Sequence, residues 1–213
     1  MLESAAPEAA HRNLREIAAI NRWFGGHRVL RSVFSEIVRP GESFSVLDVG
    51  AASGDMGRRL ASLYPRARVV SLDRAPLHLE RAPEPRVVAD ALRLPFGAGA
   101  FDFVLCSSML HEIGDAEAAA LLPALLAVAR RALVVLDLER HWLAESFLPA
   151  TRWLFGWSPL TLVDGPVSVR AAYTAAELSA LARHAGVTAQ VCRHRPWFRL
   201  SLVAPAEGVI LGL

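Results

Sequence analysis

The stretch from Ser45 to Asp55 reads S-V-L-D-V-G-A-A-S-G-D and decides the fold predicted for the chain. Its apolar first half predicts a buried strand, and the segment from Met56 to Leu63 predicts a helix directly behind it. The turn between them consists of small residues: Gly50, Ala51, Ala52, Ser53 and Gly54. Such a turn reaches backbone angles closed to larger residues and lets a ligand approach the main chain closely. The pattern predicts a site for a nucleotide-like cofactor at the end of this strand.

Asp48, two residues before Gly50, discriminates between the two cofactors that bind turns of this kind. A dinucleotide site usually reads G-x-G-x-x-G and places a pyrophosphate at the helix N-terminus. A carboxylate at position 48 would repel that pyrophosphate, but it would attract a cofactor that carries a sulfonium and an ammonium group. The acid therefore favours S-adenosylmethionine over NAD.

The same stretch resembles motif I of class I S-adenosylmethionine-dependent methyltransferases, whose usual form is acid-x-Gly-x-Gly-x-Gly. Ala52 stands where the middle glycine is usual, and we expect the backbone path to be kept at the cost of one methyl group of clearance. The resemblance runs from about Phe44 to Val203 and is closest to small-molecule enzymes, including those of quinone and phenolic-lipid biosynthesis. It implies a Rossmann-like α/β fold with helices on both faces of a mostly parallel seven-stranded sheet. It also implies a terminal antiparallel hairpin whose last strand lies between the fifth and sixth.

Two further carboxylates follow predicted strands. Asp73 ends the strand predicted over 67–73 and lies 73 − 54 = 19 residues past Gly54, close to the roughly 20 expected for an acid that binds a ribose diol. Arg74 is expected at the edge of the adenosine pocket. The alternatives are a solvated acid at a strand end and a solvated arginine.

The run from Val87 to Asp102 resembles the D-A-x-x-L-P-F block of the same family. The resemblance places Asp90 where a carboxylate accepts the adenine amino group, and it places the Ala91 backbone amide opposite a ring nitrogen. Asp102 is expected to orient the local backbone.

His111 is the candidate catalytic residue. It lies in the loop that begins at Ser107, after a predicted strand, and ligands in parallel sheets bind beyond the carboxyl ends of the strands. An unperturbed pKa of about 6.5 would let its imidazole accept a proton from a phenol or enol near neutral pH. A histidine packed under the loop is the alternative. Glu112 is a weaker candidate, and Asp137 and His141 at the end of the next strand are second-rank ones.

A chain of 213 residues suits one α/β domain with an added element. Helices predicted over 8–23 and 29–38 form an N-terminal cap across residues 1–42, which either covers the cofactor or acceptor site or plugs a face of the sheet. The methyltransferase domain is expected over 43–206 and a tail over 207–213.

An insertion is expected at about 141–172, after the fifth strand, and its first part concentrates large aromatic residues: Trp142, Phe147, Trp153, Phe155 and Trp157. They either pack as a core helix or form an acceptor pocket or lid for an aromatic or lipid-like substrate. Residues 160–170 predict a loop around Gly165. Asp115 is the predicted cap of one later helix, and Thr174 with Glu177 predicts a capping box for another.

Composition narrows the classes of protein and partner. A chain that is 53% hydrophobic and 21% charged can build a large core, and its basic residues, all arginine, form no clustered stripe, so we expect no nucleic acid partner. Cys106 and Cys192 make neither a disulfide framework nor a zinc motif, so we expect no metal and a reducing cytoplasm. The N-terminus lacks a signal-peptide pattern, and charges interrupt the longest apolar stretch, at 116–138. No transmembrane segment is expected, and contact with a membrane surface stays open.

These observations predict methyl transfer from S-adenosylmethionine to a small-molecule acceptor, phenolic, quinone-like or lipidic, by in-line displacement. Two alternatives stay open. A catalytically silent S-adenosylmethionine-binding regulatory protein would keep the cofactor residues and lack a pocket open to the methyl group. A NAD-linked oxidoreductase would use the glycine turn for a pyrophosphate.

Overall fold

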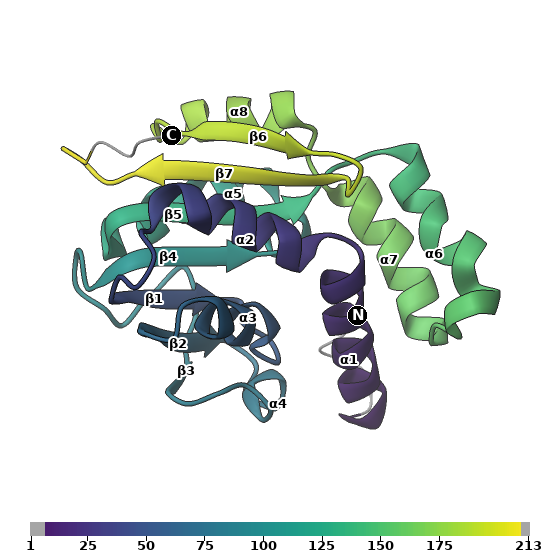
Figure 1. The fold of residues 1–213 in the computed structure, drawn as a ribbon. Coiled ribbons are helices and arrows are strands. Elements are labelled where there is room, and N and C mark those ends of the chain that lie inside the picture. Colours follow the sequence, from purple (N-terminus) through teal and green to yellow (C-terminus); the bar gives the residue numbers. More distant parts are fainter. Residues whose placement is uncertain (1–6, 210–213) are drawn as a thin grey trace.

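The computed structural model describes residues 7–209, so parts of the predicted cap and tail, residues 1–6 and 210–213, lie outside the described residues. A seven-stranded sheet forms the centre of the molecule (Figure 1). Its strands are β1 (Phe44–Val49), β2 (Ala67–Asp73), β3 (Arg86–Val88), β4 (Phe101–Ser107), β5 (Ala129–Leu138), β6 (Gln190–His194) and β7 (Arg199–Pro205). Their order is β3-β2-β1-β4-β5-β7-β6, and only the pairings of β7 with β5 and β6 are antiparallel. The predicted sheet, with the last strand between the fifth and sixth, is confirmed.

The register of the parallel strands brings their carboxyl ends to one edge of the sheet. Asp48 of β1 is level with Ser71 of β2 and Leu105 of β4, so the segments that follow these three strands emerge side by side. Ligands bind at this edge in open parallel sheets. The strand order therefore places the predicted cofactor turn beside the loop that carries His111.

Helices cover both faces of the sheet. The helices are α1 (Pro7–Trp23), α2 (Gly26–Ile37), α3 (Asp55–Leu63), α4 (Pro76–Leu79), α5 (Asp115–Val128), α6 (Trp142–Phe155), α7 (Pro159–Ala171) and α8 (Ala175–His184), and η2 (Leu110–Glu112) is a 3₁₀ turn. Apolar side chains of α2 and α3 pack on one face of the sheet, and those of α5 and α8 pack on the other. The central strands are buried on both faces, as their continuous apolar runs require.

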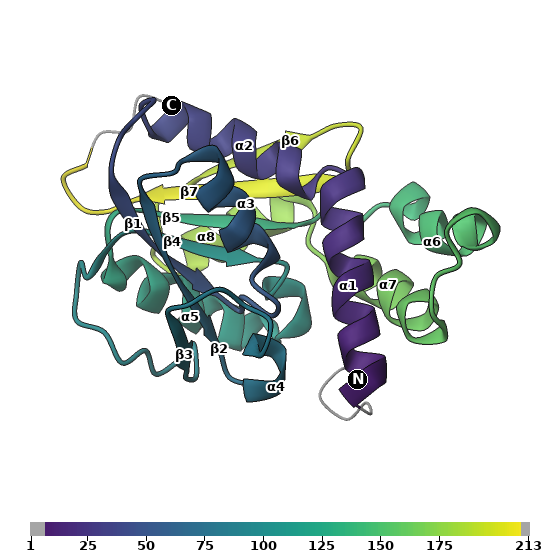
Figure 2. The same ribbon diagram turned by 60° about the horizontal axis from the view of Figure 1, so that its bottom comes forward.

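Helix α1 stands at the carboxyl edge of the sheet, between the strands and the pair formed by α6 and α7 (Figures 1 and 2). Its Glu16 carboxylate accepts hydrogen bonds from the Ser158 backbone amide at 3.1 Å and from the Thr161 hydroxyl at 2.5 Å. The Asn13 side-chain amide donates to the Thr161 hydroxyl at 2.9 Å. A carboxylate at a helix N-terminus is favourable, and these contacts fix the start of α7 against α1.

The prediction of a loop over residues 160–170 is wrong, because this segment belongs to helix α7. The Ser158 hydroxyl caps its N-terminus by accepting from the Thr161 amide at 3.3 Å, and Pro159 takes the first turn, where its missing donor is not needed. Gly165 lies inside α7, where it allows close helix packing and does not form a turn. A Cβ at this position would lie 2.2 Å from Cδ1 of Leu148, so α6 and α7 approach each other at this point.

The predicted side-chain cap is confirmed for α8 and is wrong for α5. Thr174 and Glu177 form the predicted capping box, with the Thr174 backbone amide donating to the Glu177 carboxylate at 2.8 Å. Asp115 does not cap α5, because the N-cap is Gly114 and Asp115 is already helical. Asp115 instead accepts a hydrogen bond from the Tyr173 hydroxyl at 2.7 Å. Within the described part of the chain, no helix combines the length and apolar character that a bilayer crossing requires.

Candidate active site

A cavity of about 620 Å³ opens at the carboxyl edge of the sheet, a volume typical of small-molecule sites. Most of the residues predicted for the site contribute to its wall: Asp48, Gly50, Ala51, Ala52, Ser53, Asp73, Arg74, Asp90, Ala91, Ser107 and His111. Gly54, predicted with them, lies outside the wall and under the α4–β3 loop. A Cβ there would come within 2.5 Å of Cδ of Pro83, so the absence of a side chain at Gly54 serves chain packing.

The turn after β1 follows a glycine-like path although it contains an alanine. Gly50 has a φ of 66°, and a Cβ on it would lie 3.0 Å from the Met109 sulfur. Ala52 has a φ of 49°, in the left-handed region, which costs an L-residue about 1 to 2 kcal/mol. The Ala52 amide donates to Oδ2 of Asp73 at 3.0 Å and joins the turn to the tip of β2.

Backbone strain in the described residues concentrates around this cavity. The non-glycine residues with positive φ among residues 7–209 are Ala52, Ser108 and Phe198, and all of them line the wall. They come from three separate segments of the chain. Strained backbone persists only where the surrounding structure enforces it, and it clusters at functional sites. The tertiary structure around the cavity therefore holds these three residues in backbone conformations that their side chains disfavour.

Asp48 carries a titratable charge beneath the turn. Its carboxylate is almost fully buried and accepts a hydrogen bond from the Gly57 amide at 3.1 Å, which holds the first turn of α3 to β1. Burial raises the pKa of Asp48 to about 7, and the negative charges of Asp55 and Asp73 add to the rise. A nearby positive charge would therefore ionise Asp48 readily at neutral pH.

Asp73 is held at the tip of β2 in its ionised form. Its carboxylate accepts hydrogen bonds from the Ala52 amide at 3.0 Å and the Ala75 amide at 2.9 Å, and Nδ1 of His78 lies 3.5 Å away. Burial alone would raise its pKa, but these hydrogen bonds outweigh burial and lower the pKa. Asp90 lies at the same cavity, past the end of β3, and is exposed.

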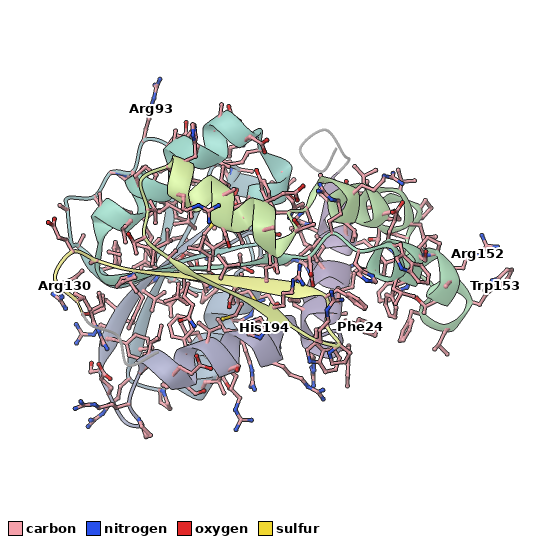
Figure 3. All side chains as sticks on the ribbon, turned by 90° about the horizontal axis from the view of Figure 1, so that it is seen from above. Phe24, Arg93, Arg130, Arg152, Trp153 and His194 are labelled. Carbon is pink, nitrogen blue, oxygen red and sulfur yellow. The ribbon has the colours of Figure 1, made fainter. Side chains whose placement is uncertain are left out.

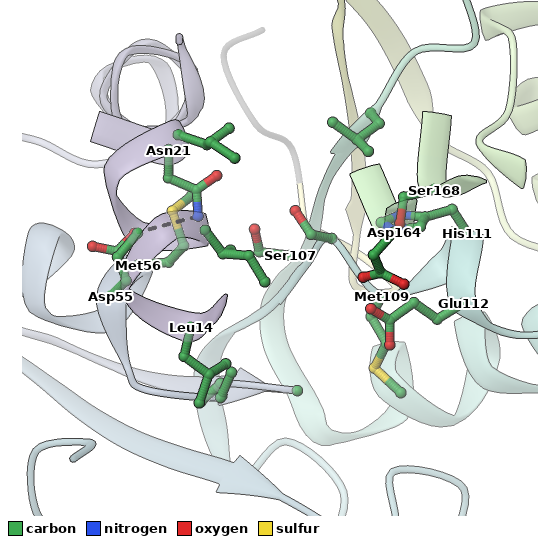
Figure 4. Close-up of a pocket in the computed structure, with 18 of the residues that line it drawn as sticks. Leu14, Asn21, Asp55, Met56, Ser107, Met109, His111, Glu112, Asp164 and Ser168 are labelled. Atoms are coloured by element: carbon green, nitrogen blue, oxygen red, sulfur yellow. Dashed lines mark hydrogen bonds between the residues drawn. The ribbon is translucent and has the colours of Figure 1, made fainter. Parts of the chain in front are cut away.

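The opposite wall consists of helices. In Figure 4, Leu14 and Asn21 of α1 lie with Asp55 and Met56 of α3 on one side of the cavity, and side chains of η2 and α7 lie on the other. The side-chain amide of Asn21 donates to Asp55 at 3.3 Å, which joins α1 to the start of α3. Leu14 and Asn21 are seven residues apart in α1, so they share the side of the helix that lines the cavity.

His111 forms a buried dyad with Asp137. Nδ1 of His111 lies 2.5 Å from Oδ1 of Asp137, and the Asp137 carboxylate also accepts from the backbone amides of Leu110 at 3.0 Å and Leu138 at 2.7 Å. Burial lowers the pKa of His111, but the charge and hydrogen bond of Asp137 outweigh it, so the pKa is raised. Asp137 fixes one ring nitrogen and leaves Nε2 as the site for proton transfer. Of the two second-rank candidates, Asp137 thus joins the site, whereas His141 caps α6 by accepting from the Leu143 amide at 3.2 Å.

Two charged residues in the wall carried no strong signal in the sequence. The pKa of Glu112 is raised by burial, and the negative charges of Asp164 and Asp137 add to the rise. Arg199, at the start of β7, is buried and donates to Oδ1 of Asn21 at 3.2 Å. Burial lowers the pKa of its guanidinium. A lone arginine in a predicted strand matches no motif, so only the fold could bring it to the site.

The aromatic residues of α6 divide between the two predicted roles. Phe147 lines the cavity and makes an edge-to-face contact with Phe24, which follows the last residue of α1, with ring centroids 4.5 Å apart. Trp157 and Phe155 pack against the same Phe24 ring. Trp142 and Trp153 point into solvent, so neither a core helix nor a pocket wall accounts for them.

Comparisons with known proteins agree with this geometry. Residues 46–132 match a family model described as a methyltransferase domain. The malonyl-[acyl-carrier protein] O-methyltransferase of Legionella pneumophila is 36% identical over 74 residues, and that of Geobacter sulfurreducens is 39% identical over 89 residues. Residues 46–132 carry the methyltransferase match, and the fold around them is that of class I S-adenosylmethionine-dependent methyltransferases. These comparisons support S-adenosylmethionine as the cofactor.

The similarity to the two curated methyltransferases is partial. It covers 31% and 38% of this chain and 26% and 32% of those proteins, so the match spans about a third of their length or less. The solved structure of an S-adenosylmethionine-dependent methyltransferase from Aquifex aeolicus has the same fold, with a TM-score of 0.65 at 16% identity over 95% of this chain and 99% of that chain. Magnesium protoporphyrin IX methyltransferase from Synechocystis, with bound S-adenosylhomocysteine, aligns with a TM-score of 0.59 at 19% identity over 86% and 84% of the two chains.

Proposed function

We propose that this methyltransferase transfers a methyl group to an oxygen atom of a small, largely apolar acceptor. The observation that carries the proposal is the His111–Asp137 dyad, which lies in the wall of the same cavity as the turn after β1. A positioned imidazole that accepts a proton is what a hydroxyl nucleophile needs, whereas a sulfur or amine nucleophile would depend on it less. The dyad therefore favours a hydroxyl acceptor.

The sheet side of the cavity provides the groups that would hold the cofactor. Asp73 presents an ionised carboxylate for the ribose hydroxyls, and Asp90 with the Ala91 amide would face the adenine ring, with Arg74 at the rim. The backbone of Gly50–Ser53 is open to close approach, and Ser107 lies at the end of β4 beside it. Asp48 would offset the positive charges of the cofactor from below.

The donor supplies an electrophilic methyl group on positively charged sulfur, so the protein needs to align the acceptor and exclude water. In the proposed reaction, Nε2 of His111 takes the proton of the acceptor hydroxyl as oxygen attacks. Asp137 stays ionised and stabilises the imidazolium that forms, because its pKa is lowered by His111 despite complete burial. Glu112, beside His111, carries a raised pKa and lies in the same wall.

The helical side of the cavity favours an acceptor with an apolar body. Leu14 and Ile17 of α1 and Phe147 and Leu148 of α6 line it, and Met109 lies near the turn. These side chains match phenolic, quinone-like or lipidic molecules better than a charged metabolite. Burial of an apolar body against them would supply binding energy away from the reacting oxygen.

Arg199 favours a second acceptor class, a carboxylate. Its buried guanidinium lies in the cavity wall with one hydrogen bond to Asn21 among the described residues, and a guanidinium pairs with a carboxylate in two-pronged geometry. The two curated relatives are named as O-methyltransferases of a malonyl-acyl carrier protein, which carries a carboxylate. A carboxylate is already ionised at neutral pH and needs no base, so His111 would be dispensable for such an acceptor.

Two measurements test the proposal. Calorimetric titrations with S-adenosylmethionine and S-adenosylhomocysteine should show one site for each, and a parallel titration with NADH should show none. A transfer screen with radiolabelled donor over phenols, quinones, hydroxylated lipids and short acyl carboxylates should then label at least one hydroxyl compound. Donor binding without transfer to any compound would point to the regulatory alternative, and binding of NADH in place of the donor would overturn the proposal.

A further inference from the structure

Helix α6 presents an apolar face to solvent. Trp142, Trp153 and Leu154 are 68%, 84% and 78% exposed. The spacing of Trp142, Pro149 and Trp153 is seven and then four residues, so they share one side of the helix and the two tryptophans stand about 16 Å apart along it. The outer side of a surface helix normally carries charged residues. A cluster of large apolar side chains in that position marks a surface that is covered by a partner.

Exposed apolar side chains also lie where the end of α1 meets the end of α6. Trp23 is 62% exposed, and it shares a surface hollow with Phe155 at the end of α6 and with Trp157. We call the exposed side chains of this region the tryptophan face, and they are Trp23, Trp142, Trp153, Leu154 and Phe155. Figure 3 shows Trp153 at the outermost part of the molecule, far from the sheet. A broad, flat partner can therefore reach this end of the molecule.

Charges around the tryptophan face are mostly positive, although Arg12 pairs with Glu16 and Arg170 pairs with Glu145. The exposed ionised residues on the described parts of α1, α6 and α7 are arginines, apart from Glu8: Arg12, Arg15, Arg22, Arg152 and Arg170. Two of them lie over rings of the face, with Arg22 at 5.2 Å from the Trp23 centroid and Arg152 at 4.6 Å from the Trp153 centroid. Arginine and tryptophan side by side are typical of helices that lie in the headgroup region of an anionic bilayer.

The same helix also lines the cavity. Leu143 is both exposed and part of the cavity wall, and Ala144 and Phe147 continue the wall inward. A molecule that leaves the outer surface of α6 would thus pass along apolar side chains to the site. The entrance and the tryptophan face belong to one helix.

We propose that the tryptophan face rests on an anionic phospholipid surface, from which an acceptor with a lipid tail enters the cavity. The entry route rests on the proposed function, whereas the docking itself does not. A second copy of the chain is a poorer occupant, because a two-fold dimer would place the arginines of one face against the same arginines of the other. Phospholipid headgroups offer the opposite charge, and the bilayer interface accepts indole rings.

Co-sedimentation with vesicles tests the docking. We expect the full chain to bind vesicles of phosphatidylglycerol and phosphatidylcholine, and to bind pure phosphatidylcholine less well. Leu154→Ser and Trp153→Ser should each weaken binding by roughly tenfold or more, because a large apolar side chain leaves the lipid. The matched control is Val88→Ser, which changes a 57% exposed apolar residue on β3 and should bind like the unchanged chain. Equal binding by Leu154→Ser and Val88→Ser would overturn the proposal.

A charge reversal provides a second, independent test of docking to anionic vesicles. Arg152→Glu should weaken binding to the anionic vesicles by roughly fivefold or more at low salt, with a smaller effect at high salt. Arg93→Glu is the matched control, because Arg93 is exposed at the other end of the molecule, as Figure 3 shows. A loss of equal size in both variants would mean that net charge alone drives binding, which would refute docking through this face.

Sedimentation equilibrium without lipid tests whether a second copy of the chain covers the tryptophan face instead. A dimer that dissociates in Trp153→Ser, in a chain that ignores vesicles, would replace the lipid surface with a second copy and overturn the proposal. Donor affinity and transfer to a water-soluble phenol are measured on the same variants. Those two properties should be unchanged in Trp153→Ser, so failure of docking is distinguishable from failure of the proposed methyl transfer.

Discussion

The two sides of the cavity are built in different ways. The sheet side consists of the segments that follow β1, β2 and β4, where strand register sets the position of every group and hydrogen bonds such as Ala52 to Asp73 join neighbouring tips. The helical side consists of α1, which precedes the sheet in the sequence, and of α6 and α7, which follow β5. Side chains such as Glu16 join α1 to α7. The sheet side carries the carboxylates of Asp48, Asp73 and Asp90, whereas most of the lining residues on the helical side are apolar.

The sheet side lies mostly within the range that the methyltransferase family model matches, whereas the helical side lies outside that range. The matched methyltransferase model covers residues 46–132, which contain the turn, Asp73, Asp90 and His111, and it ends before α6. The helices that would contact an acceptor lie outside the matched range. A division of labour follows: the sheet side would govern donor affinity, and the helical side would govern acceptor affinity.

The largest expected effect comes from the residue at the border between the two sides. His111→Gln keeps a group that can hydrogen bond to Asp137 and removes the base. We expect turnover of a hydroxyl acceptor to fall by roughly 10²- to 10⁴-fold, with donor affinity unchanged. Single-turnover transfer and calorimetry measure the two quantities.

The pH dependence identifies the role of His111 more closely. Because its pKa is raised by Asp137, transfer should decline as pH falls through that pKa and protonates Nε2. Asp137→Asn removes the charge that raises the pKa, so the decline should move to lower pH. Full activity of His111→Gln on a carboxylate acceptor would instead favour the second acceptor class, and loss of folding in that variant would indicate a packing role.

On the sheet side, Asp73→Asn should weaken donor binding by about 1 to 3 kcal/mol, because one acceptor for the ribose hydroxyls becomes an amide donor. The acceptor KM measured at saturating donor should stay the same. Asp102→Asn is a suitable control, since Asp102 is a carboxylate that accepts from the Ser45 amide at 2.8 Å at the other end of β1. An Asp73→Asn variant with normal donor affinity would remove Asp73 from the site.

On the helical side, Phe147→Ala should raise the acceptor KM by roughly tenfold, because an aromatic wall of the cavity is lost. Donor affinity should not change, which is the opposite pattern to Asp73→Asn. Trp153→Ala on the same helix is the control and should leave the KM of a water-soluble acceptor unchanged. Equal changes in donor and acceptor affinity for Phe147→Ala would contradict the division between the two sides.

The sheet side of the cavity could be predicted from the sequence more fully than the helical side. The turn of Gly50–Gly54 and the carboxylates after β2 and β3 were predictable, because a short motif records the contact between a strand end and its own helix. The strand order came through the family resemblance. The partner of His111 was only a second-rank candidate, because a contact between residues 26 apart leaves no pattern in the sequence.

Helix α7 illustrates the physical reason for the failures. Gly165 and Pro166 are turn residues by local preference, yet packing against Leu148 of α6 uses the missing Cβ of Gly165. The contact that anchors this helix joins Glu16 to Thr161, 145 residues away. Tertiary contacts of this kind overrule local preference, and they build the helical side of the cavity.

A smaller effect is expected from the charge beneath the turn. Asp48 has a pKa of about 7, so the ligand-free site holds a proton below that pH and loses it above. The positively charged donor stabilises the ionised form, so its affinity should rise from pH 6 to pH 7.5 by roughly threefold to tenfold. Calorimetry across this range should find no such rise in Asp48→Asn. The same slope in both proteins would assign the pH dependence to another group.

The smallest expected effect concerns the alanine in the turn. Ala52→Gly relieves left-handed strain of about 1 to 2 kcal/mol, while a freer unfolded chain costs about 0.4 to 1 kcal/mol. The difference is a gain in unfolding free energy of about 0 to 1.6 kcal/mol, or a rise in Tm of at most roughly 6 °C for a chain of this size. Because the Ala52 amide already donates to Asp73, donor affinity should stay within about twofold of the original. A lower Tm would mean that the methyl group of Ala52 makes packing contacts worth more than the strain, and the turn would then be adapted to alanine.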